Sequence, residues 1–206
     1  MATAQQNSRA AVCYSMRRMT KPWKYDFNIA KFTKALQLDP ANFRAYKDRG
    51  NAYYKKGMFD LAIADYSKAI EINPQYFIAF NNRGNVYQHI GKHELAILDY
   101  NETIELEPEN GMPYNNRGFT FLLLGKLEEA ERDLRKSLEL NENNIYALNS
   151  MAELYSAKNN PDEACKWLKI AIQKGYNNWN YLRMSKTYDN VRNSKCFRDI
   201  IQKKQP

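Results

Sequence analysis

A repeat period of about 34 residues constrains this chain more than any other feature of its sequence. The residues that repeat are glycines, alanines and aromatic residues, each at a fixed place in the unit. They are Gly50, Gly84 and Gly118; Ala62, Ala96, Ala130 and Ala164; and Tyr46, Phe80 and Tyr114, with Leu148 in the fourth unit. A fixed period of this length predicts an array of repeats in which each unit packs on its neighbours.

Each unit is predicted to form two helices. The glycine of the first helix and the alanine of the second mark the place where the backbones cross closely, because a larger side chain would overpack the crossing. Aromatic residues at helical spacing fill the space around them. The second helix of successive units ends at Asp39-Pro40, Asn73-Pro74 and Glu107-Pro108, since the residue before a proline is disfavoured in the α conformation. The sequence therefore predicts stacked helical hairpins and no sheet.

These landmarks resemble the tetratricopeptide repeat (TPR) family. The resemblance implies an all-α fold, an α-solenoid in which helical hairpins stack into a right-handed superhelix. It also implies a protein–protein interaction scaffold or adaptor that binds a peptide or a helical segment in its concave groove. We expect no cofactor and no catalytic activity, because the sequence contains no Walker motif, no dinucleotide-binding glycine loop and no G-x-S-x-G.

The array is predicted to span residues 9–174. Its repeats begin near residues 43, 77, 111 and 145, and a degenerate first hairpin spans residues 9–40, because residues 25–40 align without gaps on residues 59–74. Residues 1–8 are small and polar, which predicts a disordered tail. The period fails after Gly175, and apolar residues at helical spacings predict closing helices over residues 175–206.

The charge of the chain is unevenly distributed. The formal net charge is +8, with seven Lys or Arg against two Asp or Glu in residues 1–40 and eleven against five in residues 145–206. Residues 77–110 are acidic, with two basic residues against six acidic ones. Basic ends could bind nucleic acid, which leaves open a nucleic-acid-associated scaffold as the alternative function. A solvated surface explains the same charges without any partner.

The cysteines and the hydropathy pattern predict a cytoplasmic protein. Cys13, Cys165 and Cys196 are odd in number and widely spaced, which predicts reduced thiols and neither a disulfide framework nor a zinc site. No run of 18 apolar residues is present, so we expect no membrane insertion. The sequence does not reveal the oligomeric state.

Two further sets of residues have structural interpretations. The first consists of Arg49, Arg83 and Arg117, which Asp65, Asp99 and Asp133 follow at one constant interval. The fourth unit has lost both members together, which predicts an ion pair inside each of the other units. The second is His89 and His93, which have the spacing of metal ligands on one helix. Because Gly91 separates them at a predicted turn, we expect no metal site.

An asparagine-rich strip on the first helices is the predicted binding surface. Asparagine is a poor helix former, and its amide can both donate to and accept from the backbone of an extended peptide. The predicted peptide-binding residues are Arg44, Lys47, Asn51, Tyr54, Lys55, Asn81, Asn82, Asn85, His89, Met112, Asn115, Asn116, Phe119 and Asn149. Tyr146 and Glu153 lie on the same strip in the fourth unit.

Some members of the TPR family bind the C-terminal carboxylate of heat-shock chaperones with five clamp residues. Lys47, Asn51 and Asn82 match the first three of them, whereas the last two, which are basic in the clamp, are Met112 and Asn116 here. Co-chaperone-like binding of an acidic tail is therefore an alternative, and a different peptide is the preferred ligand.

Overall fold

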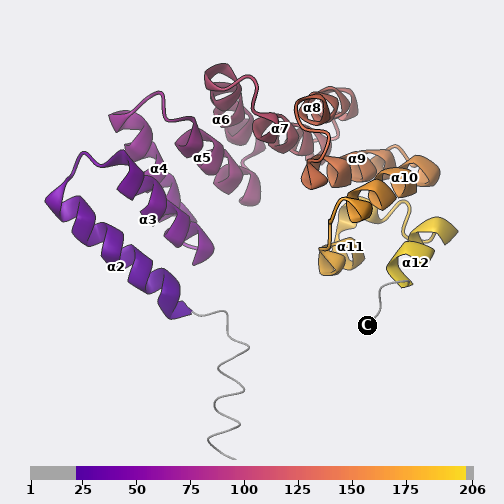
Figure 1. The fold of residues 1–206 in the computed structure, drawn as a ribbon, viewed down its shortest axis with the longest axis horizontal. Coiled ribbons are helices and arrows are strands. Elements are labelled where there is room, and N and C mark those ends of the chain that lie inside the picture. Colours follow the sequence, from indigo (N-terminus) through magenta and orange to yellow (C-terminus); the bar gives the residue numbers. More distant parts are fainter. Residues whose placement is uncertain (1–21, 203–206) are drawn as a thin grey trace, which may run out of the picture. The chain divides into compact units, whose positions relative to one another are not determined.

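The computed structural model describes residues 22–202, and every regular element in that range is helical (Figure 1). The α-helices are α2 (Pro22–Leu38), α3 (Phe43–Lys55), α4 (Phe59–Ile72), α5 (Phe77–His89), α6 (His93–Leu106), α7 (Gly111–Leu123), α8 (Leu127–Leu140), α9 (Ile145–Ala157), α10 (Pro161–Gln173), α11 (Trp179–Met184) and α12 (Lys195–Gln202). A short 3-10 helix, η1, spans Lys186–Tyr188. The predicted all-α fold of helical hairpins is confirmed.

The hairpins follow the period of the sequence. The first helices α3, α5, α7 and α9 begin at equal intervals along the chain, at Phe43, Phe77, Gly111 and Ile145. The second helices α4 and α6 end at Ile72 and Leu106, directly before the Asn-Pro and Glu-Pro pairs that were predicted to end them. Contacts between residues divide the chain into two compact units, Met1–Ala79 and Phe80–Pro206.

The glycine of each first helix lies at a close helix crossing. A Cβ atom added to Gly84 would lie 2.8 Å from the ring of Tyr100, and one added to Gly50 would lie 2.8 Å from the ring of Tyr66. The alanine of the partner helix is fully buried, as Ala96 in α6 illustrates. Small residues therefore recur because the second helix occupies the space that a larger side chain would need, with a tyrosine ring at Gly50 and Gly84 and with Asp133 and Leu134 at Gly118.

The predicted ion pairs form in all three regular hairpins. Arg83 donates from Nε and Nη2 to the two carboxylate oxygens of Asp99, at 2.9 and 2.7 Å. The same two-pronged contact joins Arg49 to Asp65 and Arg117 to Asp133. Burial raises the pKa of Asp99, while the hydrogen bond and charge of Arg83 act to lower it. Each pair therefore joins the two helices of one hairpin at its buried face.

The fourth hairpin, α9 and α10, is more deeply buried than the regular ones. Every residue of α9 from Ala147 to Leu154 is buried. Asn160 is the N-cap of α10: its Oδ1 accepts from the backbone N–H of Glu163 at 3.1 Å, and Pro161 is the first helical residue. η1 packs against α9, and α12 packs against α10. The closing segment thus covers a helix that has almost no solvent-facing side.

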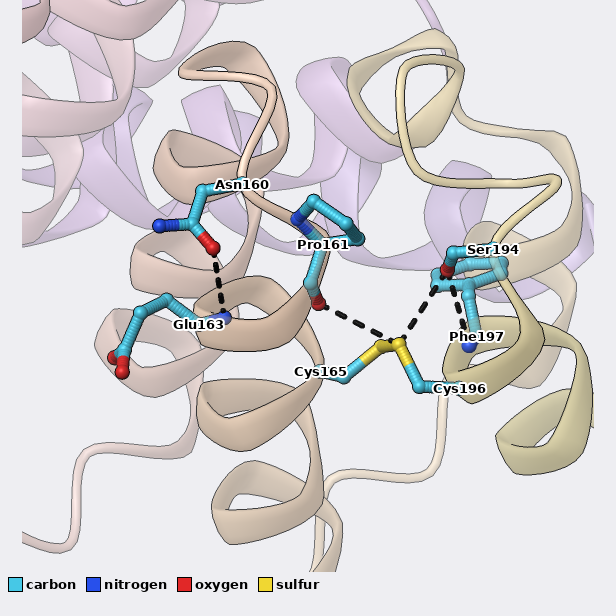
Figure 2. Close-up of a disulfide and its surroundings, with 7 residues drawn as sticks. All are labelled: Asn160, Pro161, Glu163, Cys165, Ser194, Cys196 and Phe197. Carbon is cyan, nitrogen blue, oxygen red and sulfur yellow. Dashed lines mark hydrogen bonds between the residues drawn. A yellow bond between two sulfur atoms is a disulfide. The ribbon is translucent and has the colours of Figure 1, made fainter.

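A disulfide joins α10 to the C-terminal helix α12. Cys165 and Cys196 are bonded, with their Cα atoms 6.2 Å apart and a sequence separation of 31 (Figure 2). The prediction of reduced thiols is wrong for this pair. Sequence spacing did not reveal the bond, because the fold of the non-periodic closing segment is what brings α12 back onto α10. Cys13 lies outside the described residues.

Other predictions concern absences and the chain ends. His89 ends α5 and His93 begins α6, with Gly91 between them at a φ of 77°. Within residues 22–202, no three His, Cys, Asp or Glu side chains gather as metal ligands would. None of the helices in that range combines the length and apolar character that a membrane crossing needs. The predicted tail over residues 1–8 and the first helix of the first hairpin lie outside the described residues.

Candidate functional site

A polar and aromatic pocket in the unit Phe80–Pro206 is the candidate site, and we call it the α7–α9 pocket. It encloses about 220 Å³. Its walls come from the first helices α5, α7 and α9 and from the start of the closing segment. The lining residues are Gln88, Asn115, Asn116, Phe119, Tyr146, Asn149, Ser150, Glu153, Tyr176, Asn178 and Tyr181.

The pocket brings together four of the predicted binding residues. Asn115, Asn116 and Phe119 come from α7, and Asn149 comes from α9. Tyr146 and Glu153 belong to the same predicted strip and line the pocket as well. The other predicted residues of this unit, Asn81, Asn82, Asn85, His89 and Met112, lie on α5 and α7 outside the lining.

Five lining residues were not predicted, and two of them could have been found from the period. Gln88 lies one period after Tyr54, and Ser150 lies one period after Asn116, so both occupy places that the strip already included. Tyr176, Asn178 and Tyr181 belong to the closing segment. No repeat signal reaches that segment, because the period ends at α10.

Part of the asparagine row has a structural role. Asn85 Oδ1 accepts from the hydroxyl of Tyr100 at 2.9 Å and from Nδ2 of Asn116 at 3.1 Å. Nδ2 of Asn116 also donates to Asn81 Oδ1 at 3.1 Å. These amides therefore join α5 to α6 and α7, a role that the repeat pattern of the sequence does not reveal.

The predicted residues of α3 belong to the other unit, Met1–Ala79. Asn51 Oδ1 accepts from the hydroxyl of Tyr66 at 2.7 Å, and Lys47 is paired with Asp48 at 2.6 Å. The Lys55 ammonium lies 5.5 Å from the ring centre of Tyr54. Arg44 is exposed, with its guanidinium 5.0 Å from the ring centre of Phe43.

Glu153 is a buried carboxylate in the lining of the pocket, with 1% of its surface exposed. Oε1 accepts from the hydroxyls of Tyr181 and Thr187 at 2.5 and 2.6 Å, and Oε2 accepts from Asn149 Nδ2 at 2.8 Å. Burial raises the pKa of Glu153 to about 7, although these three hydrogen bonds act to lower it. The acid therefore changes its charge near neutral pH.

Asn115 adds an unsatisfied acceptor to the lining. Its side chain is 7% exposed and its Nδ2 donates to Asn116 Oδ1 at 3.3 Å, but its buried Oδ1 receives no hydrogen bond within the described part of the chain. An unpaired buried acceptor costs free energy, about 1–3 kcal/mol by mutational measures. A ligand that donated to this oxygen would recover part of that cost.

Solved structures of TPR proteins are similar to this chain. A crystal structure of MamA is 25% identical, covering 73% of this chain and 88% of its own, with a TM-score of 0.64. The first TPR of Spaghetti (RPAP3), bound to the HSP90 peptide SRMEEVD, is 33% identical and covers 56% of this chain and 92% of its own, with a TM-score of 0.54. TTC0263 from Thermus thermophilus is 21% identical, covering 85% and 93%, with a TM-score of 0.66. No curated protein matches the chain.

Family models match the repeats directly. A model described as TPR repeat matches residues 24–57 and 50–91, and one described as Tetratricopeptide repeat matches residues 77–110 and 113–144. Both models describe a repeat, and neither describes a catalytic family. The matches, the period of the sequence and the helical hairpins agree, and the chain belongs to the tetratricopeptide repeat family.

Proposed function

We propose that this chain is a non-catalytic protein-interaction module that binds a peptide segment of its partner through the α7–α9 pocket. The single observation that carries the proposal is the pocket itself, in which first-helix side chains of successive repeats meet the closing segment. Ligand sites are concave, and they combine aromatic surface with a few polar groups that fix orientation. The α7–α9 pocket has both, since Phe119 and Tyr146 lie beside side-chain amides.

The position of the pocket suits a chain that runs across the repeats. Equivalent places on neighbouring first helices are adjacent in a repeat stack, and α7 contacts α9 directly. A peptide seated in the pocket would meet Asn116 and Ser150, which hold the same place in successive repeats. Groove binding by the longer strip predicted from the sequence is part of this proposal.

A similar protein supports peptide binding without identifying the peptide. The first TPR of Spaghetti (RPAP3), 33% identical over 56% of this chain, binds the HSP90 peptide SRMEEVD. This chain has Met112 and Asn116 where the family clamp has basic residues. Binding of an acidic tail is therefore the alternative, which enrichment of Asp and Glu among the peptides selected in the experiment below would favour.

Selection from a random peptide library displayed on phage tests the proposal. The wild-type chain should retain a family of related peptides. A Phe119→Ala/Tyr146→Ala variant should retain at least tenfold fewer phage that display these peptides, since aromatic anchors carry much of an interface's binding energy. Arg132→Ala on the exposed face of α8 is the matched control. Equal retention by all three proteins would exclude the α7–α9 pocket as the binding site. If nothing is retained, the peptide-binding function is wrong.

A cytoplasmic location, predicted from the sequence, belongs to the same proposal. The disulfide between Cys165 and Cys196 bears against it, because structural disulfides persist mainly in oxidising compartments. Alkylation of thiols at the moment of cell lysis, followed by mass spectrometry, measures which state exists in cells. A cytoplasmic protein should have both thiols alkylated. If neither Cys165 nor Cys196 is alkylated, the disulfide exists in cells and the chain resides in an oxidising compartment.

A further inference from the structure

We infer that the α7–α9 pocket selects a cationic side chain, the guanidinium of arginine or the ammonium of lysine, in the peptide that the chain binds. This inference rests on the proposed function and specifies the ligand of the same site. The lining contains no cationic side chain among the described residues, and two of its buried acceptors can take a further hydrogen bond. Acidic and apolar side chains are the competing ligands that the experiment must exclude.

The charge of the lining is one-sided. Glu153 is its single carboxylic acid, and among the described residues that form the walls there is no Lys, Arg or His. Every donor to Glu153 is neutral: two hydroxyls and one amide. Buried carboxylates are normally paired with a cation. In the three regular hairpins of this chain, Asp65, Asp99 and Asp133 each have an arginine for that purpose.

The Glu153 carboxylate can accept one more hydrogen bond. A carboxylate offers about four lone-pair positions, and the contacts of Glu153 occupy two on Oε1 and one on Oε2. Asn115 Oδ1 is a second acceptor, with no donor among the described residues. Both side chains line the same pocket. A ligand group rich in N–H donors and without acceptors complements them, which describes guanidinium and ammonium groups.

The aromatic walls favour the same ligand. Phe119, Tyr146, Tyr176 and Tyr181 line the pocket, and Tyr146 is 65% exposed at its rim. Aromatic faces attract cations, and arginine in particular stacks on them. A volume of about 220 Å³ is below the range of about 300–1,000 Å³ found for drug-sized ligands, so a single side chain is the better fit.

Binding of a cation should be linked to the protonation of Glu153. Its pKa of about 7 results mainly from burial, and the titratable groups that face it are Tyr176, Tyr181 and Tyr188. All three tyrosines have pKa values raised above their ordinary range, so Glu153 is the group that titrates at neutral pH. A bound cation favours the carboxylate, so binding should release a proton and strengthen as pH rises through 7.

Matched capped peptides test the inference on the full chain. The probes are acetyl-Ala-Arg-Ala-amide, its citrulline counterpart, which is neutral and nearly the same shape, and acetyl-Ala-Glu-Ala-amide. Two-dimensional NMR titration gives both the affinity and the residues that respond. The arginine peptide should shift Asn115, Tyr146 and Tyr181 resonances and bind about tenfold more tightly than the citrulline peptide, a difference of about 1.4 kcal/mol. The glutamate peptide should not bind the pocket.

Two variants and one control make the result specific. Glu153→Gln should lower the affinity for the arginine peptide to the affinity for the citrulline peptide and abolish its pH dependence. Tyr146→Ala should weaken binding of the arginine peptide several-fold. Tyr146 is largely exposed, so its replacement leaves the fold intact even if Glu153→Gln does not fold. Arg132→Ala on α8 should change nothing.

Three results would overturn the inference: equal binding of arginine and citrulline, preference for glutamate, or no response of the pocket to the arginine peptide. Its failure is separable from failure of the proposed function. Library peptides that need Phe119 and Tyr146 but carry no enriched arginine or lysine would reject cation selection and keep peptide binding. An absence of any retained peptide would reject both.

Discussion

The regular hairpins and the fourth hairpin place different residues at one point of the first helix. In the hairpins α3–α4 and α5–α6, Asn51 and Asn85 each accept a hydrogen bond from a tyrosine of their own second helix, Tyr66 and Tyr100 respectively. The hairpin α7–α8 has Phe119 and Leu134 at these two places. Glu153 holds the same place in α9. The place that holds a neutral amide in these two repeats thus holds a buried acid in the fourth.

The donors also come from different parts of the chain. Leu168 stands where the fourth hairpin would have its tyrosine, and it is fully buried. Tyr181 and Thr187 of the closing segment donate to Glu153 instead. In the hairpins α3–α4 and α5–α6 the second helix of the same hairpin supplies this donor, whereas the fourth hairpin depends on the segment that follows it. This dependence also creates the α7–α9 pocket, since Tyr176 and Tyr181 form part of its wall.

Reducing the disulfide should give the largest effect and should act on the fourth hairpin. Closing a loop of 31 residues stabilises by about 3–4 kcal/mol in the chain-entropy model. A Cys165→Ala/Cys196→Ala variant should show that loss in denaturant unfolding and should no longer respond to reductant. Cys13→Ser is the control and should keep the full response. Equal stability with and without the bond would mean that the closing segment is held by packing alone.

Breaking one regular ion pair should cost nearly as much. Asp99→Leu leaves a guanidinium buried without its partner, which typically costs about 3 kcal/mol or more. Arg83→Met should cost less, because Asp99 can take up a proton whereas arginine cannot lose one. The double variant lacks both charges, as does the fourth hairpin with Met151 and Trp167 at these places, and it should lose less than the sum of the two. Additive losses in urea denaturation would contradict the pairing.

Glu153 should make the fourth hairpin sensitive to pH. Its folded pKa of about 7 lies above its unfolded value near 4.5, so the folded state binds the proton more tightly. Its contribution to stability is therefore fully present below pH 4.5 and is lost as pH rises through 7, by about 2–3 kcal/mol between about pH 5 and pH 8. Glu153→Gln should flatten that part of the profile. A parallel decline in both proteins would assign the effect to other groups.

The glycine of the regular crossing should give the smallest effect. Gly84→Ala gains helix propensity of about 1 kcal/mol but forces the ring of Tyr100 to move, since the new Cβ would lie 2.8 Å from it. We expect a net loss of about 1 kcal/mol. The fourth hairpin already has Ala152 at this place, fully buried, so Ala152→Gly should also destabilise by about 1 kcal/mol. Thermal melts should show a lower melting temperature than wild type for both variants. A higher melting temperature for either variant would contradict the proposed difference between the two crossings.

The sequence predicted most where the chain repeats itself. The residues that correspond to Arg83 and Asp99 are either both present or both absent in each repeat. This pattern identified an ion pair, because two residues that contact each other are kept or lost together. The period also marked Asn115 and Asn116 for the site. It said nothing of Tyr181 or of the disulfide, because both depend on how a segment without a repeat folds back. The burial of Glu153 was equally hidden, since its donors lie 28 and 34 residues away in that segment.

Photo-crosslinking from the pocket rim tests the central claim most directly. A benzophenone side chain introduced in place of Tyr146, which is 65% exposed, would react with whatever occupies the α7–α9 pocket. If the α7–α9 pocket binds the peptide, a library-selected peptide should crosslink from position 146 and should not crosslink from position 132 on α8. Crosslinking from position 132, or from neither position while the peptide still binds, would place the binding surface elsewhere and contradict the account.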